Sequence, residues 1–250
     1  MMTSEEQQAK IVDLAKGLKL PVMAEFHRHV STDAGFSDNL LRLLEMETME
    51  KERRCVERRT KAAGFPIIHT LDTFEFDGRL PHLNRDRVWG LAGSSYVTEK
   101  RNIIAIGNSG TGKTHLVTAL GLEAIRRGFT VRFRRISDMV NQMSEAQHAK
   151  QLSRYIKTLN NCHLLICDEL GYLHFNLESA SLLFQVFAAR YEVSSTIVTT
   201  NLEFSKWPQF LGDDPVMTTA LVDRLIHRAE ILNMNGKGYR LKDAKGEGHA

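Results

Sequence analysis

Asn102-Ile-Ile-Ala-Ile-Gly-Asn-Ser-Gly-Thr-Gly-Lys-Thr114 joins a short apolar run to a glycine-rich turn that ends in lysine and threonine. The apolar run predicts a buried strand, and the residues from Thr114 to Arg127 have helical spacing that ends at Gly128. A phosphate-loop motif between a strand and a helix predicts backbone N–H groups arranged around phosphates, with the positive end of the helix dipole behind them.

This loop supplies most of the predicted cofactor-binding residues. Lys113 is expected to reach the β- and γ-phosphates, and the hydroxyl of Thr114 is expected to bind Mg²⁺. The segment therefore predicts a site for ATP and Mg²⁺, formed by Gly107, Asn108, Ser109, Gly110, Thr111, Gly112, Lys113, Thr114 and His115.

Outside the loop, strands and helices alternate along the chain. Thr130–Phe133, His163–Cys167 and Thr196–Thr199 are short apolar runs, and helical spacing separates them at Leu152–Leu159 and Ser181–Tyr191. Continuous apolar runs are typical of strands that are covered on both faces. The sequence predicts an α/β fold with a parallel sheet between helices.

The N-terminal part has a different pattern. Residues 4–63 have helical apolar spacing, which Gly64-Phe-Pro66 interrupts. We predict a small all-helical N-terminal domain over residues 1–68 and a nucleotide-binding domain over residues 69–250. Strand-like Glu230–Leu232 and Tyr239–Leu241 use most of the sequence after Arg228, so a separate helical lid domain is not expected.

Two carboxylates follow the strand that ends at Cys167. At the carboxyl edge of a parallel sheet, Asp168 is expected to bind Mg²⁺ and Glu169 to polarise the attacking water. The alternative is a solvated acidic turn after a buried strand. The phosphate loop upstream favours the catalytic interpretation, and an acidic pair at this position favours hydrolysis of ATP over binding alone.

Two further polar positions are candidates for the same reaction. Asn201 follows the strand that ends at Thr199 and could lie between the γ-phosphate and water, although an Asn can also close a strand by turn chemistry. Arg224 and Arg228 are four residues apart, as on one helical face, and Arg224 is the preferred arginine finger, acting on a neighbouring subunit. Local pairing of Arg224 with a carboxylate is the alternative. The catalytic candidates are Lys113, Glu169, Asn201 and Arg224.

The composition limits the class of protein. Of 250 residues, 42% are hydrophobic and 25% charged, which is typical of soluble globular domains. The sequence has no apolar run of membrane-spanning length and no signal-peptide pattern at its start, so we expect a cytoplasmic location and no membrane partner. Three cysteines and ten histidines form no metal-binding pattern, which leaves Mg²⁺ as the expected metal.

Basic residues gather in two places, although the net charge is only +3. One is Lys51–Lys61, which could instead be a solvated helix with internal Glu–Arg pairs. The preferred DNA-binding surface is the second, where lysines and arginines could neutralise phosphates without reading sequence. Its residues are Arg132, Arg134, Arg135, Lys150, Arg154 and Lys157, the last three spaced as one helical stripe.

Taken together, these motifs resemble the IstB-like subgroup of DnaC-type AAA+ proteins. The resemblance covers nearly the whole chain, and its carriers are Leu18–Met23, Phe65-Pro66 with Leu71–Asp77, Gly107–Leu116, Gly121–Ile125, Asp168–Tyr172, Thr199–Asn201 and Asp223–Leu225 through Tyr239–Lys242. Ser109-Gly110 differs from the Pro-Gly pair of many relatives but keeps the fixed Gly, Lys and Thr positions. Residues 77–100 match the family poorly, and no site is predicted there.

The resemblance implies an AAA+ core behind a helical domain, self-assembly into a multi-subunit ring or spiral on double-stranded DNA, and delivery of a cognate transposase. A helicase loader or replication initiator acting on single strands is the alternative, with the same nucleotide site. The N-terminal segment resembles the transposition helpers more. A small-molecule kinase would need an acceptor-binding lid that the sequence does not contain.

Overall fold

The computed structural model describes residues 2–76, 78–212 and 214–236. The chain divides into two compact units, Met1–Arg58 and Arg59–Ala250, and the 28-residue helix α3 (Phe36–Ala63) passes through the division. The predicted domain boundary after residue 68 stays a prediction.

The first unit is helical throughout its secondary structure. It contains α1 (Ser4–Gly17), α2 (Pro21–Ala24), the 3-10 helix η1 (Phe26–Arg28) and the start of α3. Thr3 and Glu6 form a capping box at the start of α1. The buried carboxylate of Glu47 on α3 accepts the N–H groups of Val22 and Met23 at 2.8 and 3.1 Å, which ties α2 to α3. The predicted helical N-terminal region is confirmed.

The second unit contains a five-stranded sheet in the order β2-β3-β4-β1-β5. Every neighbouring pair of strands is parallel. The strands are β1 (Asn102–Ile106), β2 (Val131–Arg135), β3 (Leu164–Leu170), β4 (Ser195–Thr200) and β5 (Ala229–Asn233). The parallel sheet is confirmed, and β5 confirms the strand expected at Glu230–Leu232. The strand expected at Tyr239–Leu241 lies outside the described residues.

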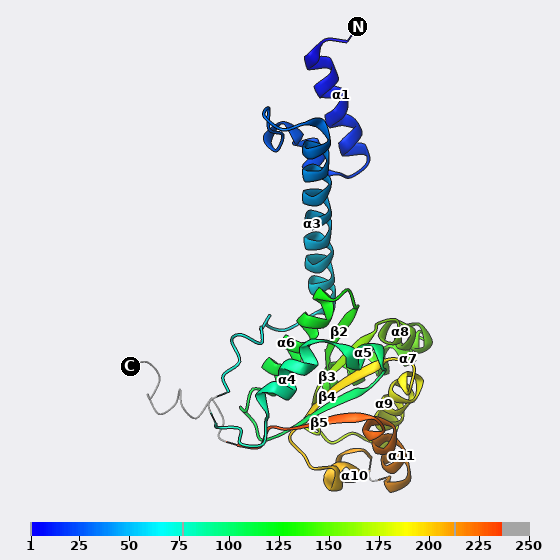
Figure 1. Cartoon of the computed structure of the whole chain (residues 1–250). Helices are drawn as coiled ribbons and strands as arrows, with labels where there is room; N and C mark the ends of the chain where they lie inside the picture. Colours follow the sequence, from blue (N-terminus) through cyan, green and yellow to red (C-terminus); the bar gives the residue numbers. More distant parts are fainter. Residues whose placement is uncertain (1, 77, 213, 237–250) are drawn as a thin grey trace, which may run out of the picture. The chain divides into compact units, whose positions relative to one another are not determined.

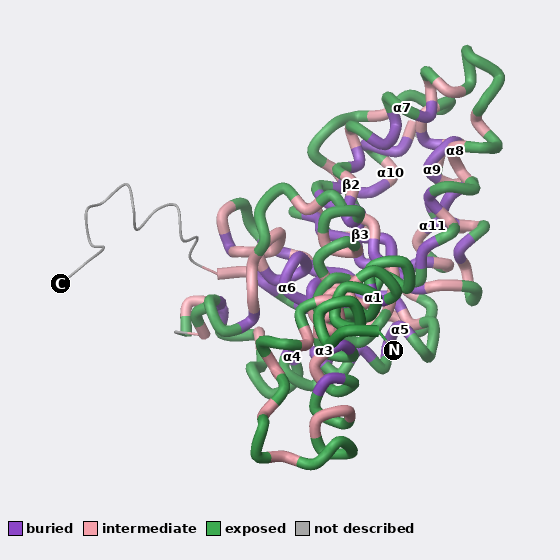
Figure 2. Tube along the Cα trace, turned by 90° about the horizontal axis from the view of Figure 1, so that it is seen from above, coloured by how far each residue is buried: buried purple, intermediate pink, exposed green. Residues whose placement is uncertain are grey.

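Helices cover both faces of this sheet (Figure 1). On one face lies α6 (Lys113–Arg126), with α4 (Arg85–Ala92) against it; α5 (Ser95–Thr98) precedes β1. The other face carries α7 (Ile136–His148), α8 (Leu152–Asn160), α9 (Leu177–Arg190), η2 (Phe204–Lys206), α10 (Trp207–Phe210) and α11 (Pro215–Ile226). Figure 2 shows the buried positions along β2, β3 and α6.

The buried face of each element explains why the sheet forms. Ile104, Leu165 and Val198 project from three neighbouring strands into a core that includes Met139 of α7 and Leu183 of α9. Burying such side chains removes apolar surface from water, at roughly 25 cal/mol per Å². The core thereby fixes the strands in register and brings the carboxyl ends of β1, β3 and β4 to one edge.

None of the helices in the described part of the chain is long and apolar enough to cross a membrane.

Candidate nucleotide-binding site

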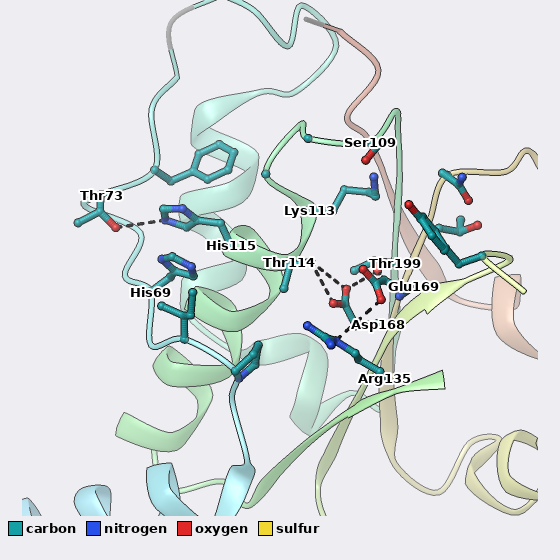
Figure 3. A pocket seen from close by; sticks show the side chains of 18 of the residues that line it. His69, Thr73, Ser109, Lys113, Thr114, His115, Arg135, Asp168, Glu169 and Thr199 are labelled. Carbon is teal, nitrogen blue, oxygen red and sulfur yellow. Dashed lines mark hydrogen bonds and ion pairs between the residues drawn. The ribbon is translucent and has the colours of Figure 1, made fainter. Parts of the chain in front are cut away.

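A cavity of about 480 Å³ opens at the carboxyl edge of the sheet. Three loops that follow strands line it, together with the start of α6 and a segment that precedes the sheet (Figure 3). Its lining residues are Pro66, Ile67, His69, Thr73, Phe74, Glu75, Ser109, Gly110, Gly112, Lys113, Thr114, His115, Arg135, Asp168, Glu169, Tyr172, Thr199, Thr200 and Asn201. The fold thus brings the predicted loop, acidic pair and amide to one place.

The glycines of the loop are required by its backbone path. Gly110 and Gly112 have φ of +80° and +86°, a region that residues with a Cβ seldom adopt. Gly107 needs space instead, because a Cβ there would lie 2.3 Å from the carbonyl oxygen of Met234. Gly112 is also the N-cap of α6, so the loop leads directly into the N-terminal turn of that helix. Such a turn presents free backbone N–H groups to an anion.

The ammonium group of Lys113 lies over the loop. Its Nζ donates hydrogen bonds to the carbonyl oxygens of Gly107 and Asn108, at 2.6 and 2.7 Å. These bonds hold a positive charge at the side of the cavity that the phosphate loop forms. A cation in this position can attract phosphate oxygens.

Thr114, Asp168 and Thr199 form a hydrogen-bonded chain at the base of the cavity (Figure 3). The Thr114 hydroxyl donates to the Asp168 carboxylate, at 3.0 and 3.2 Å from its two oxygens. From the next strand, the Thr199 hydroxyl donates to Oδ1 of Asp168 at 2.5 Å. Asp168 is only 1% exposed, so these hydroxyls hold its carboxylate in one orientation.

Glu169 differs from Asp168 in both exposure and backbone conformation. Its φ of +65° is unusual for a residue with a side chain, and its carboxylate is exposed at the cavity. The Glu169 N–H donates to the Thr199 hydroxyl at 2.9 Å, which holds this backbone turn. One strand end therefore carries a buried carboxylate and an accessible one, which suits metal binding and proton acceptance respectively.

Arg135 is a cavity residue that the sequence assigned to the DNA surface. It ends β2, and its Nε lies 3.9 Å from a carboxylate oxygen of Glu169 (Figure 3). Both side chains are about half exposed, so solvent weakens this ion pair. A cation near Glu169 lies within the nucleotide site, and the position of Arg135 just after an apolar run was the signal that could have suggested it.

Residues 66–75 form the opposite side of the cavity and are named here the 66–75 wall. Pro66, Ile67, His69, Thr73, Phe74 and Glu75 line the cavity, and none was predicted as a site residue. Leu71 and Phe74 are buried and anchor the segment. This side is more apolar than the side that carries Lys113, Asp168 and Glu169.

His115 contacts this wall. Its ring stacks on His69 with 4.1 Å between centroids, and its Nε2 lies near Thr73 and Thr70. Burial lowers the pKa of His115 below its usual value, and the neighbouring His69 lowers it further. The neutral form is therefore favoured, although the hydrogen bond to the Thr70 carbonyl acts in the opposite direction.

Comparison with known proteins identifies the family. The profile of the family described as "IstB-like ATP binding protein" matches residues 13–246. The chain belongs to this family. A relative from Geobacillus stearothermophilus, named as an ATP-binding protein of insertion sequence IS5376, is 38% identical over 94% of this chain and 95% of its own length. A second, from Pseudomonas aeruginosa and named for insertion sequence IS21, is 37% identical over 86% and 81%.

Solved structures show that the IstB-like fold is that of AAA+ proteins. DnaA from Aquifex aeolicus with AMPPCP bound matches with a TM-score of 0.58 and 20% identity, over 74% of this chain and 55% of that one. The DnaC helicase loader matches with a TM-score of 0.54 and 21% identity, over 70% and 98%. The resemblance inferred from sequence is confirmed, as are the α/β class and the parallel sheet.

In this AAA+ core the proposed arginine finger lies outside the cavity of its own chain. The Arg224 guanidinium donates to the Ala220 carbonyl at 2.7 Å and lies 5.0 Å from the ring centroid of Phe184. The expectation that Arg224 and Arg228 share a helical face is wrong, because α11 ends at Ile226 and Arg228 has a φ of +60°. Arg224 therefore lies on α11, whereas Arg228 lies in the turn that follows this helix.

The residues of the predicted DNA surface belong to β2, to α8 and to the turn before α8. Arg132 and Arg134 lie two residues apart on one face of the edge strand. Burial raises the pKa of the Tyr155 phenol of α8, and the nearby charges of Arg134 and Arg132 act in the opposite direction. The predicted stripe through Lys150, Arg154 and Lys157 is wrong in one respect. Lys150 has a φ of +55° and precedes α8, so only Arg154 and Lys157 are helical.

The alternative basic segment, Lys51–Lys61, lies on α3 and makes internal ion pairs. Arg53 and Arg54 both bind Glu50, at 2.8 and 2.6 Å, and Arg53 also pairs with Glu57. These pairs are the internal Glu–Arg contacts of the simpler interpretation. They reduce the free positive charge of this helix.

Proposed function

We propose that this IstB-like protein hydrolyses ATP, and that its ATP-bound form assembles on double-stranded DNA and recruits a transposase. The observation that supports this best is the pairing of a phosphate loop with two unlike carboxylates in one cavity. An accessible carboxylate beside one that is placed to bind a metal favours hydrolysis over binding alone. Hydrolysis requires a group that can orient and deprotonate water.

The phosphate loop would hold the triphosphate. The turn that Gly110 and Gly112 create leads into the first turn of α6, whose N–H groups have no partner within the helix, and the Lys113 ammonium lies beside the loop. Preorganised N–H donors and a fixed cation stabilise negative charge with little reorganisation. Lys113 would leave its two carbonyl partners to bind the β- and γ-phosphates.

The residues also fit Mg²⁺. Thr114 and Asp168 offer hard oxygen ligands that already lie within hydrogen-bonding distance of each other, and Mg²⁺ commonly uses few protein oxygens beside phosphates and water. Bound there, Mg²⁺ would neutralise charge on the phosphate oxygens. Thr199 would keep the Asp168 carboxylate oriented. Glu169 would accept a proton from water, and Asn201 would orient that water from the next loop.

A second copy of the chain would complete the site. Arg224 lies outside its own cavity, as an arginine finger acting in trans must. An arginine delivered by a neighbour would link hydrolysis to assembly. Its present partners are a backbone carbonyl and an aromatic face, which it can exchange for a phosphate without leaving a buried carboxylate unpaired.

The DNA and transposase parts rest on the family and on charge. Two relatives named for insertion sequences are 38% and 37% identical to this chain. Insertion sequences move by transposition. The basic residues of β2, α8 and the intervening turn offer phosphate contacts without a sequence preference. The same fold in DnaA and DnaC makes single-stranded DNA the alternative ligand.

Fluorescence anisotropy with labelled duplex and single-stranded DNA would test the proposal, at one salt concentration and with no nucleotide, ADP or ATP. We expect ATP to strengthen binding to the duplex, with Lys113→Ala as the nucleotide-binding control. Preference for single strands would favour a helicase loader or replication initiator instead. ATP hydrolysis without binding to either DNA would leave the ATPase standing and contradict the DNA-dependent role.

A further inference from the structure

His115 directly follows the threonine of the phosphate loop, yet its side chain faces the 66–75 wall (Figure 3). We propose that His115 is a positioning residue, which holds this wall against the first turn of α6 so that the nucleoside of bound ATP meets a preformed surface. The proposal rests on the ATP-binding function above. The sequence predicts His115 as a cofactor-binding residue, and this proposal specifies that role.

The two ends of the cavity differ in chemistry, and this difference orients the nucleotide. Lys113, Asp168 and Glu169 lie at the charged end, where the terminal phosphate must be if Glu169 is to activate water. A triphosphate that extends from there across the phosphate loop would place its nucleoside at the other end of the cavity. Ile67 lines that end and is 63% exposed, so the flat face of a base placed against it would remove apolar surface from water.

The wall is anchored on both sides of the positions that His115 contacts. Before them, Phe65 packs edge-on against Phe133 and reaches Gly121 of α6, where a Cβ would lie 3.0 Å from the Phe65 ring. After them, Phe74 is buried and its N–H donates to the Leu71 carbonyl at 3.1 Å. Leu71 is also buried between these anchors, whereas Thr73 beside it is exposed.

His115 supplies a polar contact in this interval. Its Nε2 lies 3.2 Å from the Thr70 carbonyl oxygen and 3.1 Å from the Thr73 hydroxyl. A carbonyl oxygen can only accept, so Nε2 carries the proton. The Thr73 hydroxyl donates to the same Thr70 carbonyl at 2.9 Å, which leaves its oxygen lone pairs to accept from His115. One imidazole N–H thereby closes a small ring of hydrogen bonds.

Ring contacts fix the orientation of this imidazole. It stacks on His69 with only 13° between the planes, and the edge of Phe74 meets it at 84° with 5.3 Å between centroids. His69 and Phe74 both line the cavity. Because Thr114 and His115 are consecutive residues of α6, the helical turn that binds phosphate also sets the place of the wall.

The test compares ATP with inorganic tripolyphosphate, which has the phosphates but no nucleoside, by calorimetry at fixed Mg²⁺. We expect His115→Ala to weaken ATP binding about tenfold, the effect of losing one hydrogen bond and its stacking, while tripolyphosphate affinity stays unchanged. His115→Gln keeps an N–H near the position of Nε2 and should restore most of the ATP affinity. His148→Ala, an exposed histidine of α7, is the matched control.

Thr73→Val removes the partner hydroxyl without altering α6, so it remains informative even if His115→Ala folds poorly. We expect it to weaken ATP selectively, and its effect should not add to that of His115→Ala. Equal loss of ATP and tripolyphosphate would overturn the proposal, because His115 would then support the loop itself. Unchanged ATP affinity in both variants would also overturn it, while leaving the ATPase intact. Failure of the unmodified protein to bind ATP would instead refute the proposed function.

Discussion

The two ends of the nucleotide cavity are built by different means. At the charged end, Asp168 is buried and receives two hydroxyl hydrogen bonds, and Lys113 binds two backbone carbonyls. At the other end, Ile67 and Thr73 of the 66–75 wall are exposed. The wall is held by packing and by His115.

Because of this difference, we expect the charged end to determine the rate of hydrolysis and the 66–75 wall to determine the affinity for ATP. Charged groups held in fixed positions act on the transition state, where charge develops, and their loss should lower kcat. The 66–75 wall, as proposed, would bind the nucleoside equally in the ground and transition states, so its loss should raise the Kd and leave kcat nearly unchanged. Variants at the charged end should thus give large effects on rate, and those at the wall small effects on binding.

Arg224→Ala should give the largest effect, because the proposed arginine finger would no longer bring a positive charge from another copy to the charged end. We expect kcat to fall by about 10³ or more, the usual contribution of an arginine finger, with ATP binding retained. Steady-state ATPase assays and nucleotide binding by calorimetry would measure the two quantities. This result is expected if a residue of a neighbouring subunit contributes to the charged end.

A mixing experiment distinguishes action in trans from a local role. Lys113→Ala subunits have no working site but carry Arg224, so at equal mixing roughly a quarter of all sites should pair an intact loop with an intact arginine. Recovered activity is the expected result. No recovery, with Arg228→Ala inactive in its place, would move the finger to Arg228.

Glu169→Gln should lower kcat by about 10² to 10³ while ATP still binds, because the amide keeps the shape of the carboxylate but cannot accept a proton. The ATP-bound form should then accumulate on DNA. Rapid-quench measurement of bound phosphate in a single turnover would follow the chemical step. Hydrolysis at the unmodified rate would show that Glu169 is not the base and would place the charged end's chemistry elsewhere.

The sequence was sufficient to predict where the residues of the charged end lie, because these residues are close together in the chain or come at the end of a strand. The motif from Gly107 to Thr114 specifies the conformation of its own loop, and Asp168 follows a continuous apolar run that is typical of a buried strand. In a parallel sheet, strand ends meet at one edge. The place of these residues in the cavity follows from that rule, although their chemical roles stay predictions.

The 66–75 wall could not be predicted in the same way. Its residues have no motif, and their position depends on the contact of Phe65 with Gly121 and on the side chain of His115, both set by tertiary packing. Helix ends were a second source of error. Lys150 and Arg228 both adopt positive φ and leave the helices that their spacing implied, which apolar periodicity does not reveal.

Lys113→Ala should remove hydrogen bonds from a charged donor to phosphate and raise the Kd for ATP by about a hundredfold. Tripolyphosphate binding should weaken equally, in contrast to the selective effect expected for His115→Ala. Calorimetry with both ligands would compare the two ends directly. If Lys113→Ala weakened ATP but not tripolyphosphate, the assignment of the charged end to the phosphates would be wrong.

Thr199→Val is the mildest of these changes and tests the hydrogen bonds that hold Asp168 and Glu169 in place. The substitution keeps the branched shape on β4 but removes the hydroxyl that donates to Asp168 at 2.5 Å and accepts from the Glu169 N–H at 2.9 Å. Two groups would lose one partner each, at a cost of about 1 to 3 kcal/mol if they stay buried without one. Because Asp168 retains Thr114 and the Glu169 side chain stays exposed, we expect kcat to fall about tenfold with little change in Kd, and a lower Tm.

Thr196→Val, on the same strand but away from the cavity, controls for the loss of a strand hydroxyl. A raised Kd with normal kcat would mean that Thr199 supports binding, and that the charged end is less different from the wall than its hydrogen bonds suggest.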